Sequence, residues 1–311
     1  MKPKKQQTSG NYTTDIGYPL FPEIKHVGSA KIRKYKRIHQ PIWTQHKAKF
    51  IQQYLKLFVQ ITKHGAYIDG FAGPQYPDKL DAWAAALVLQ SEPKWLQHFF
   101  LCEKSPSKLR FVNSLVATQP VPRDRKGRKL PRNIEVWPGD FNINVKTILG
   151  NGKITQKEAT FCLLDQHTFE CRWHTLEQLA AYKRPPQNKI EILYFLCVRW
   201  LHRALSGIKK KDTIQQVQDW WGKSDWRELS AKTEFDIAEL MRKRFQDDLG
   251  YRHTAAFPIY DNPESNRIMY YMIHASDHEE APALMVRAHQ KAVRTLPKEI
   301  QRPFEFAEAD T

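Results

Sequence analysis

No stretch of this 311-residue sequence approaches the roughly 20 consecutive apolar residues that span a bilayer, so a membrane protein is not expected. The N-terminal MKPKKQQTSGNYTTD is basic but lacks the apolar segment of a secretory signal, which predicts a cytoplasmic location. Cysteine is scarce, and no CxxC pair or zinc-type cluster with histidine is formed by Cys102, Cys162, Cys171 and Cys197. We therefore expect reduced and buried thiols.

Acidic residues are too few to balance the basic ones. The 33 Asp and Glu residues stand against 49 Lys and Arg, which leaves a net charge of +16. A chain of this sign attracts polyanions, although a solubility surface is the alternative interpretation. The basic residues cluster in three separate segments, residues 31–37, 123–132 and 209–211. Their shared sign favours a nucleic-acid partner.

Apolar runs alternate with amphipathic ones along most of the chain. Strand-like runs at 66–71, 98–104, 134–140, 159–166 and 189–198 alternate with helical patterns at 80–90, 105–118, 141–150 and 172–183. A helix is also expected from Trp43 to Lys63, ended by Gly65. Uninterrupted apolar strands are typical of parallel sheets that are covered on both faces. The sequence therefore predicts a Rossmann-like α/β fold with a doubly wound, mostly parallel sheet.

The alternation of strand-like and helical patterns stops after about residue 200 and resumes after residue 250. Strands at 253–261 and 267–278 predict an antiparallel hairpin at a sheet edge, followed by a helix at 280–294. We expect a basic N-terminal arm (1–40), a Rossmann-like core (41–200), a helical insertion (201–250), C-terminal elements that complete the core (251–300) and a tail (301–311). In the insertion, Trp220, Trp221 and Trp226 lie among charges, either as a stacking platform for bases or as core aromatics.

The run AYIDGFAGP, residues 66–74, predicts the first strand and a ligand-binding loop. Glycines at the end of a strand let the backbone pass close to a ligand, and the following helix offers free N–H groups. Asp69, Gly70, Phe71, Ala72 and Gly73 are therefore candidate cofactor-binding residues. A plain strand-to-helix turn is the alternative for a glycine pair taken alone.

Three further strand ends carry acids in the same order. Glu103 could accept both ribose hydroxyls of an adenosyl group, and Asp140 with Phe141 suits an adenine ring. Asp165 and His167 end the most apolar strand and are the candidate catalytic residues. Ligands of open α/β sheets lie at the carboxyl ends of the strands, so the four ends should converge. Together, the four strand ends favour one binding site for S-adenosylmethionine over four unrelated turns.

The run WTQHKAKFIQQYLKLF, followed by YIDGFAGP, resembles the start of the three-Cys-motif partner (TcmP) family. The resemblance is specific over residues 43–74 and extends to about residue 200. It implies a Rossmann-like fold of the class I methyltransferase type, and an S-adenosylmethionine-dependent methyltransferase-like protein with a radical-SAM-like three-Cys-motif protein as a possible partner. It also implies that Trp43, His46 and Lys47 line the site or the substrate entry, although a helix that caps the sheet, with Trp43 as a core anchor, is the alternative. Gln75 stands where the family has a further glycine.

The turn after the fourth strand also departs from known patterns. Amino-methyltransferases of nucleic acids use a Pro-Pro-aromatic turn that holds the target amine, whereas this chain has Asp165-Gln166-His167-Thr168-Phe169. Phe169 remains a candidate for stacking a base, and Arg199 and Arg203 are candidates for contacting a phosphate.

Three functions are compatible with this pattern. The first is an S-adenosylmethionine-dependent methyltransferase-like protein that acts on or with nucleic acid. The second is a non-catalytic partner subunit that keeps the fold. The third, ranked lowest, is a metal-dependent nuclease in which Asp69, Glu103, Asp140 and Asp165 ligate Mg²⁺.

Overall fold

The computed structural model describes residues 42–43, 47–124, 126–198, 201, 204–205, 208, 211–261 and 267–294. The predicted N-terminal arm, His46, Arg199, Arg203 and the C-terminal tail lie outside the described residues. Of Trp43 only the backbone is described.

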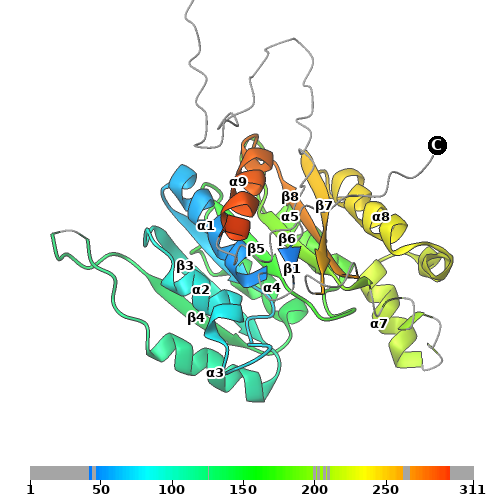
Figure 1. Cartoon of the computed structure of the whole chain (residues 1–311), viewed down its shortest axis with the longest axis horizontal. Helices are drawn as coiled ribbons and strands as arrows, with labels where there is room; N and C mark the ends of the chain where they lie inside the picture. Colours follow the sequence, from blue (N-terminus) through cyan, green and yellow to red (C-terminus); the bar gives the residue numbers. More distant parts are fainter. Residues whose placement is uncertain are drawn as a thin grey trace, which may run out of the picture.

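One mixed sheet organises the described part of the chain (Figure 1). Its strand order is β1-β7-β8-β6-β5-β2-β3-β4, and only β8 runs antiparallel to its neighbours. The strands are β1 (Ile42–Trp43), β2 (Gly65–Asp69), β3 (Leu96–Glu103), β4 (Asn133–Pro138), β5 (Thr160–Leu164), β6 (Glu191–Leu196), β7 (His253–Tyr260) and β8 (Ile268–Ser276). The order from β4 to β7, with an antiparallel β8 inserted before the last strand, is the class I methyltransferase arrangement. The predicted fold class is confirmed.

Helices cover both faces of this sheet, which explains why the central strands are mostly apolar. Every residue of β2, β5 and β6 is buried, as expected for parallel strands between two helical layers. One layer holds α1 (Lys47–Thr62), α2 (Ala84–Gln90), α3 (Pro106–Ala117) and α9 (Ala281–Arg294). The other holds α4 (Phe141–Gly150), α5 (Trp173–Ala181), α7 (Lys211–Trp221), the 3₁₀ turn η3 (Ser224–Ala231) and α8 (Glu234–Asp247).

The N-terminal boundary differs from the sequence prediction. Ile42 and Trp43 form a two-residue parallel strand against Ile259 and Tyr260 of β7, so they do not begin a helix. The predicted hairpin β7–β8 is present, but β1 covers its outer strand. The helix stop also differs: α1 ends at Thr62, and Lys63 takes the left-handed conformation at φ 64° that was expected of glycine.

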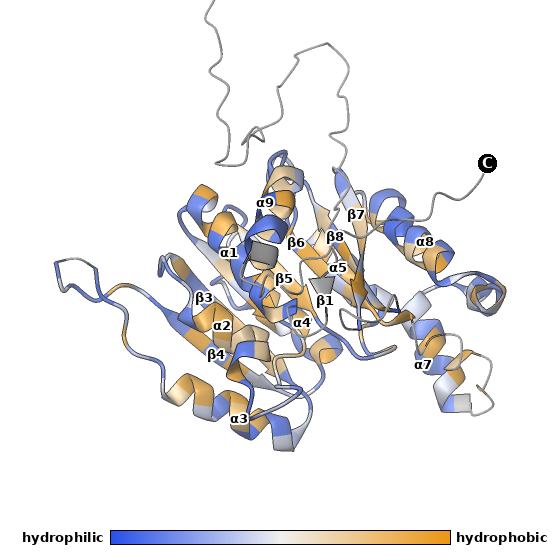
Figure 2. Ribbon diagram, viewed as in Figure 1, coloured by the Kyte–Doolittle hydropathy of each residue, from blue (hydrophilic) through white to orange (hydrophobic). Residues whose placement is uncertain are grey.

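The tryptophans of the segment between β6 and β7 belong to the core. Trp220, Trp221 and Trp226 are all buried, and Trp220 donates its indole N–H to Tyr194 Oη at 2.7 Å. Their burial supports the core interpretation and contradicts the exposed stacking platform. Figure 2 shows hydrophilic residues along α8 on the side away from the sheet. All four cysteines are free and buried, as predicted.

A buried polar network fastens α1 to the sheet. Tyr54 Oη and Glu191 Oε1 each lie 3.1 Å from His274 Nε2, and Ser276 Oγ donates to Glu191 Oε2 at 2.7 Å. Burial acts to raise the pKa of Glu191, but the hydrogen bonds from His274, Tyr54 and Ser276 outweigh it and hold the pKa below its usual range. The network fixes α1, whose first residue is Lys47.

In the described part of the chain, no helix combines the length and apolarity that crossing a membrane requires.

Candidate functional site

The loop after β2 uses its own backbone N–H groups internally. Gly70 N donates to Leu163 O at 3.0 Å and Ala72 N to Cys102 O at 2.8 Å, so the loop is fastened to the two flanking strands. Phe71 N donates to Asp69 Oδ1 at 3.1 Å, and Gly73 N donates to Glu103 Oε2 at 2.8 Å. The next α-helix begins only at Ala84. Residues 70–73 therefore offer no run of free N–H donors, and no α-helix follows them directly, contrary to the expected loop and helix with free N–H groups.

Both loop glycines are required by close packing against the chain itself. A Cβ at Gly70 would lie 2.9 Å from the Phe141 ring and 3.0 Å from Leu164. A Cβ at Gly73 would lie 2.7 Å from Glu103 Cδ. The glycines thus bring Phe141 and the Glu103 carboxylate against the loop.

Asp69 is the most deeply buried acid of the site, with 1% of its surface exposed. Its pKa is raised to about 7, chiefly by burial and to a lesser degree by the nearby Asp165 and Glu103 carboxylates. Two hydrogen bonds oppose the rise, one from Tyr67 Oη at 2.8 Å and one from Phe71 N. Asp69 therefore sits where a nearby positive charge would stabilise its ionised form.

Glu103 joins the loop to the end of β3. Its Oε2 accepts from Gly73 N, and its Oε1 accepts from Ser105 N at 2.7 Å, directly before α3. Each carboxylate oxygen can accept a second hydrogen bond, so two acceptor positions remain at this carboxylate. A pair of vicinal hydroxyls has the matching chemistry.

Asp140 caps α4 at the end of β4. Its Oδ1 accepts from Asn142 N at 2.9 Å, and Lys104 Nζ lies 3.6 Å from Oδ2. Gly139 directly before it has φ +106°, a conformation that glycine adopts without strain. Phe141 is 98% buried and packs beneath Gly70, so its ring is not available to stack on a ligand. This corrects the stacking role predicted for Phe141.

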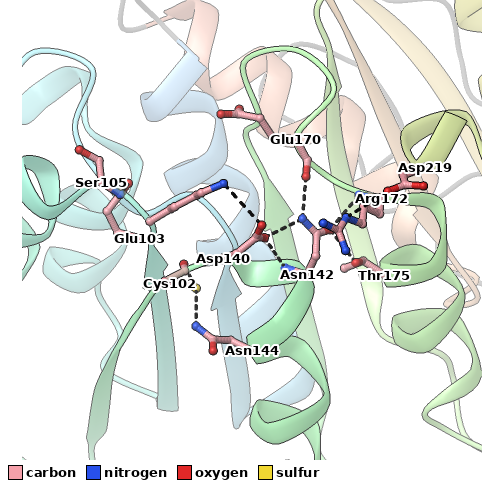
Figure 3. Close-up of polar contacts among 12 residues, drawn as sticks. Cys102, Glu103, Ser105, Asp140, Asn142, Asn144, Glu170, Arg172, Thr175 and Asp219 are labelled. Atoms are coloured by element: carbon pink, nitrogen blue, oxygen red, sulfur yellow. Dashed lines mark hydrogen bonds and ion pairs between the residues drawn. The ribbon is translucent and has the colours of Figure 1, made fainter. Parts of the chain in front are cut away.

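Asn142 links the start of α4 to the loop after β5 (Figure 3). Its side-chain N–H groups donate to Asp140 Oδ1 and to Glu170 O, both at 2.7 Å. Its side-chain oxygen accepts from Arg172 N at 2.8 Å and from Thr175 Oγ at 2.7 Å. These four bonds use the full capacity of an asparagine amide. The positions of Asp140 and of the loop after β5 are therefore coupled through one side chain.

The end of β5 meets the start of α1. Lys47 Nζ lies 2.7 Å from Asp165 Oδ1 and also faces the rings of Phe195 at 4.7 Å and Tyr270 at 5.0 Å. The two side chains are largely shielded, with 11% exposed for Lys47 and 24% for Asp165. A lysine held over two rings is stabilised by cation–π attraction in addition to the ion pair.

The turn after Asp165 is held by its own side chains. Gln166 is buried, and its Oε1 accepts from Cys171 N at 2.8 Å, which closes the turn. His167 is exposed, and its backbone N–H donates to Glu170 Oε2 at 2.7 Å. Phe169 is buried and packs edge-on against Trp220 at 5.0 Å between ring centroids. Its ring is thus a core group, contrary to the predicted base-stacking role.

The carboxyl edge of the sheet brings together most of the predicted site residues, namely Asp69, Gly70, Phe71, Ala72, Gly73, Glu103, Asp140, Asp165, His167 and Lys47. Sequence reasoning missed Asn142, Tyr67 and Glu170. Asn142 follows the capping Asp140 by two residues, but a capping pattern does not reveal that its amide also binds a loop after another strand.

The functional groups gathered at this edge are mainly hydrogen-bond acceptors. Carboxylates stand at the ends of β2, β3, β4 and β5, and the loop N–H groups are already bonded. Across the residues that the structure describes, no three His, Cys, Asp or Glu side chains are grouped as metal ligands. An edge of this kind suits a ligand that brings positive charge and hydroxyl groups.

No protein-family model matches the sequence, and no curated protein matches it. Among solved structures, the Legionella pneumophila protein LPL1258, of family model DUF519, aligns with a TM-score of 0.41 at 9% identity. That alignment covers 82% of this chain and 93% of the other. Trm1 from Pyrococcus horikoshii, in complex with S-adenosyl-L-methionine, aligns with a TM-score of 0.32 at 10% identity, over 84% of this chain and 61% of Trm1.

Both TM-scores are below 0.5, so neither alignment supports a conclusion about this chain. The fold assignment rests on the strand order of the sheet and does not depend on the two alignments. Membership of the TcmP family stays a prediction from residues 43–74.

Proposed function

We propose that this protein binds S-adenosylmethionine at the carboxyl edge of its sheet and acts as a methyltransferase-like protein on or with nucleic acid. The observation that best supports this proposal is that the edge is rich in hydrogen-bond acceptors. The loop N–H groups after β2 are bonded internally, while four carboxylates gather at the strand ends. A dinucleotide needs free N–H donors for its pyrophosphate. S-adenosylmethionine instead brings an ammonium group, a sulfonium charge and two ribose hydroxyls, and its single carboxylate needs fewer donors than a pyrophosphate does.

Each acid has a role that follows from its contacts. Glu103, with two acceptor positions left, would hold the ribose hydroxyls. Asp140 would accept from the exocyclic amine of adenine, after Lys104 moves from its 3.6 Å ion pair. Ile143, which is 69% exposed on the first turn of α4, offers apolar surface where the buried Phe141 does not. Asp69 and the loop through Gly73 would lie beside the amino-acid end.

The substrate side would be formed by Lys47, Asp165 and His167. When bound, the cofactor supplies a methyl group on a cationic sulfur, which needs an acceptor held in line more than it needs covalent chemistry by the protein. The residues of this chain would orient that acceptor and take up its proton. Asp165 already interacts with Lys47, so a proton taken by Asp165 would weaken that ion pair. The net charge of +16 supports nucleic acid as the substrate class.

A direct test incubates the protein with methyl-labelled S-adenosylmethionine and with RNA or DNA. We expect label to enter the nucleic acid, and we expect Asp165→Asn to reduce it strongly. The His167→Ala variant separates the two candidate bases, because His167 is exposed and its loss leaves the core intact. Label that enters equally with wild type and both variants would contradict the assignment of the substrate side.

One observation favours a non-catalytic alternative. Asp165 is engaged by Lys47, and Phe169 is buried, so the turn after β5 offers little of the usual machinery for a flipped base. A partner subunit would then bind the cofactor without transferring its methyl group. Cofactor binding without transfer to RNA, DNA or protein would select this alternative.

A further inference from the structure

The segment between α3 and β4 forms a basic hairpin, residues 121–132, which stands out from the body at the left of Figure 1. Its two arms are paired: Arg123 forms an antiparallel bridge with Lys129, and Leu130 N donates to Pro122 O at 2.8 Å. The exposed residues include Arg123, Lys126 and Arg128.

The hairpin tip is organised by its single acid. Asp124 Oδ1 accepts from Lys126 N at 2.9 Å and from Arg128 N at 2.8 Å, while Oδ2 accepts from Arg128 Nε at 2.7 Å. Gly127 takes the left-handed conformation at φ +76°, as a tight turn requires. Arg123 Nη1 then donates to Gly127 O at 2.7 Å. The basic side chains are therefore presented by a defined turn and not by a loose arm.

The hairpin is also anchored in the core. At its second end, Arg132 Nη2 donates to Leu89 O at 2.6 Å, and the guanidinium lies 4.8 Å from the Phe99 ring centroid. Leu89 belongs to α2 and Phe99 to β3. This anchor fixes where the hairpin leaves the sheet.

The positive charge of the hairpin indicates which kind of partner it binds. Residues 123–132 carry six basic side chains and one acid, a net charge of +5. The tip, residues 123–129, holds no apolar side chain that could enter a bilayer, and Figure 2 colours it as hydrophilic. Arg123 and Arg128 use part of their guanidinium groups inside the turn, whereas the exposed Lys126 and Lys129 can contact phosphates as point charges. Such contacts suit a phosphate backbone. A flat anionic membrane would meet only its tip.

We propose that the hairpin 121–132 is a docking element for the phosphate backbone of nucleic acid, separate from the carboxyl-edge site. It leaves the sheet at Asn133, the amino end of β4, whereas Asp140 follows the carboxyl end of the same strand. At about 3.3 Å per residue, the ten residues from Lys129 to Pro138 span roughly 30 Å. That length corresponds to about nine base pairs at about 3.4 Å each. Because this is the longest distance that the chain allows between the two places, a duplex longer than this can contact both.

The length estimate rests on the proposed function, because it concerns nucleic acid that also reaches the carboxyl edge. Docking by the hairpin is independent of that function. The two claims therefore fail separately: S-adenosylmethionine titration of the same variants reports on the carboxyl edge, and nucleic-acid affinity reports on the hairpin.

The test compares Lys126→Gln/Lys129→Gln with a matched control, Lys243→Gln/Arg252→Gln, in the full-length protein. All four side chains are exposed, and both double variants lower the net charge equally. Lys243 lies on α8 and Arg252 precedes β7, on the far side of the sheet from β4. Affinity is measured for RNA and DNA duplexes of about 24 base pairs, between about 50 and 200 mM salt. Binding to vesicles that contain phosphatidylserine is measured in parallel, to test a membrane as the partner.

We expect the hairpin variant to bind both duplexes several-fold more weakly and to lower the salt slope by about 2, one for each lost phosphate contact. The control should retain nearly wild-type affinity and slope. An RNA-only or DNA-only loss would identify the polymer and support docking. Equal losses in both variants, no loss in the hairpin variant, or a loss confined to vesicles would each overturn the proposal.

Discussion

Lys47 Nζ lies 2.7 Å from Asp165 Oδ1, although the two residues are 118 positions apart in the chain. This ion pair joins the first residue of α1 to the end of β5, at the edge where the candidate site lies. It connects the helix carrying the resemblance to the TcmP family with the acid predicted to face the substrate. Helix α1 thereby becomes part of the site.

The Lys47–Asp165 pair should show measurable energetic coupling. A double-mutant cycle with Lys47→Met and Asp165→Asn should give a coupling of about 1–2 kcal/mol in urea unfolding, because both groups are largely shielded from water. Lys94 and Glu92 form a matched control: their atoms are 3.4 Å apart and Glu92 is 71% exposed. That pair should couple by less than about 0.5 kcal/mol. Equal coupling in the two cycles would show that Lys47 contributes no more than a surface charge.

Asn142 should hold the loop after β5 in place. Asn142→Ala removes four side-chain hydrogen bonds, so we expect a loss of about 2 kcal/mol of stability and faster amide exchange across residues 166–172. Asn144 on the same helix is the control, because its amide contacts Pro138 O and Cys102 Sγ and not that loop. Unchanged exchange in this loop after Asn142→Ala would rule out the coupling.

Asp69 should make stability fall as pH rises. The folded pKa is about 7 against an ordinary value of 3.8, so between these values the folded protein keeps a proton that the unfolded chain has released. Stability therefore decreases through this window by about 1.4 kcal/mol per pH unit and levels off above pH 7. The Asp69→Asn variant has no proton to release at this position, so its stability lacks this pH dependence. The stability of the variant relative to wild type should accordingly grow between about pH 5 and 7. A difference that stays constant across this range would show that Asp69 titrates normally.

Gly73 should tolerate no side chain. A Cβ there would lie 2.7 Å from both Glu103 Cδ and Lys108 Cβ, so Gly73→Ala should lower stability by about 1–3 kcal/mol and displace the Glu103 carboxylate. Gly150→Ala is the control, because a Cβ there meets nothing within 4 Å and Gly150 ends a helix. That change should be neutral or stabilising by up to about 1 kcal/mol. Similar effects of the two substitutions, judged by thermal unfolding, would refute the close approach at Gly73.

Much of the fold could be predicted because its signals are local. The apolar runs of β2, β5 and β6 are buried on both faces, and such strands are recognisable without knowledge of their partners. The two-residue strand β1 could not be predicted. Ile42 and Trp43 are too few to show a period, and their partners Ile259 and Tyr260 are more than 200 residues away.

The site was predictable at the level of strand ends but not of side-chain environment. The acids at positions 69, 103, 140 and 165 were identified because parallel strands bring their carboxyl ends to one edge. Sequence alone did not reveal that Phe141 and Phe169 would be buried, since an aromatic side chain beside an acid is compatible with either a ligand or the core. Asn142 was missed because its partners Glu170, Arg172 and Thr175 come from the loop after β5 and the start of α5.

The most direct measurement is a calorimetric titration of the purified protein with S-adenosylmethionine, and in parallel with NAD⁺. The carboxylates at the strand ends and the internally bonded loop N–H groups predict saturable binding of S-adenosylmethionine and none of NAD⁺. Glu103→Gln should weaken the first titration, because an amide in place of Glu103 cannot accept at both oxygen positions. Binding of NAD⁺, or no binding of S-adenosylmethionine, would contradict the assignment of this edge as a sulfonium-cofactor site.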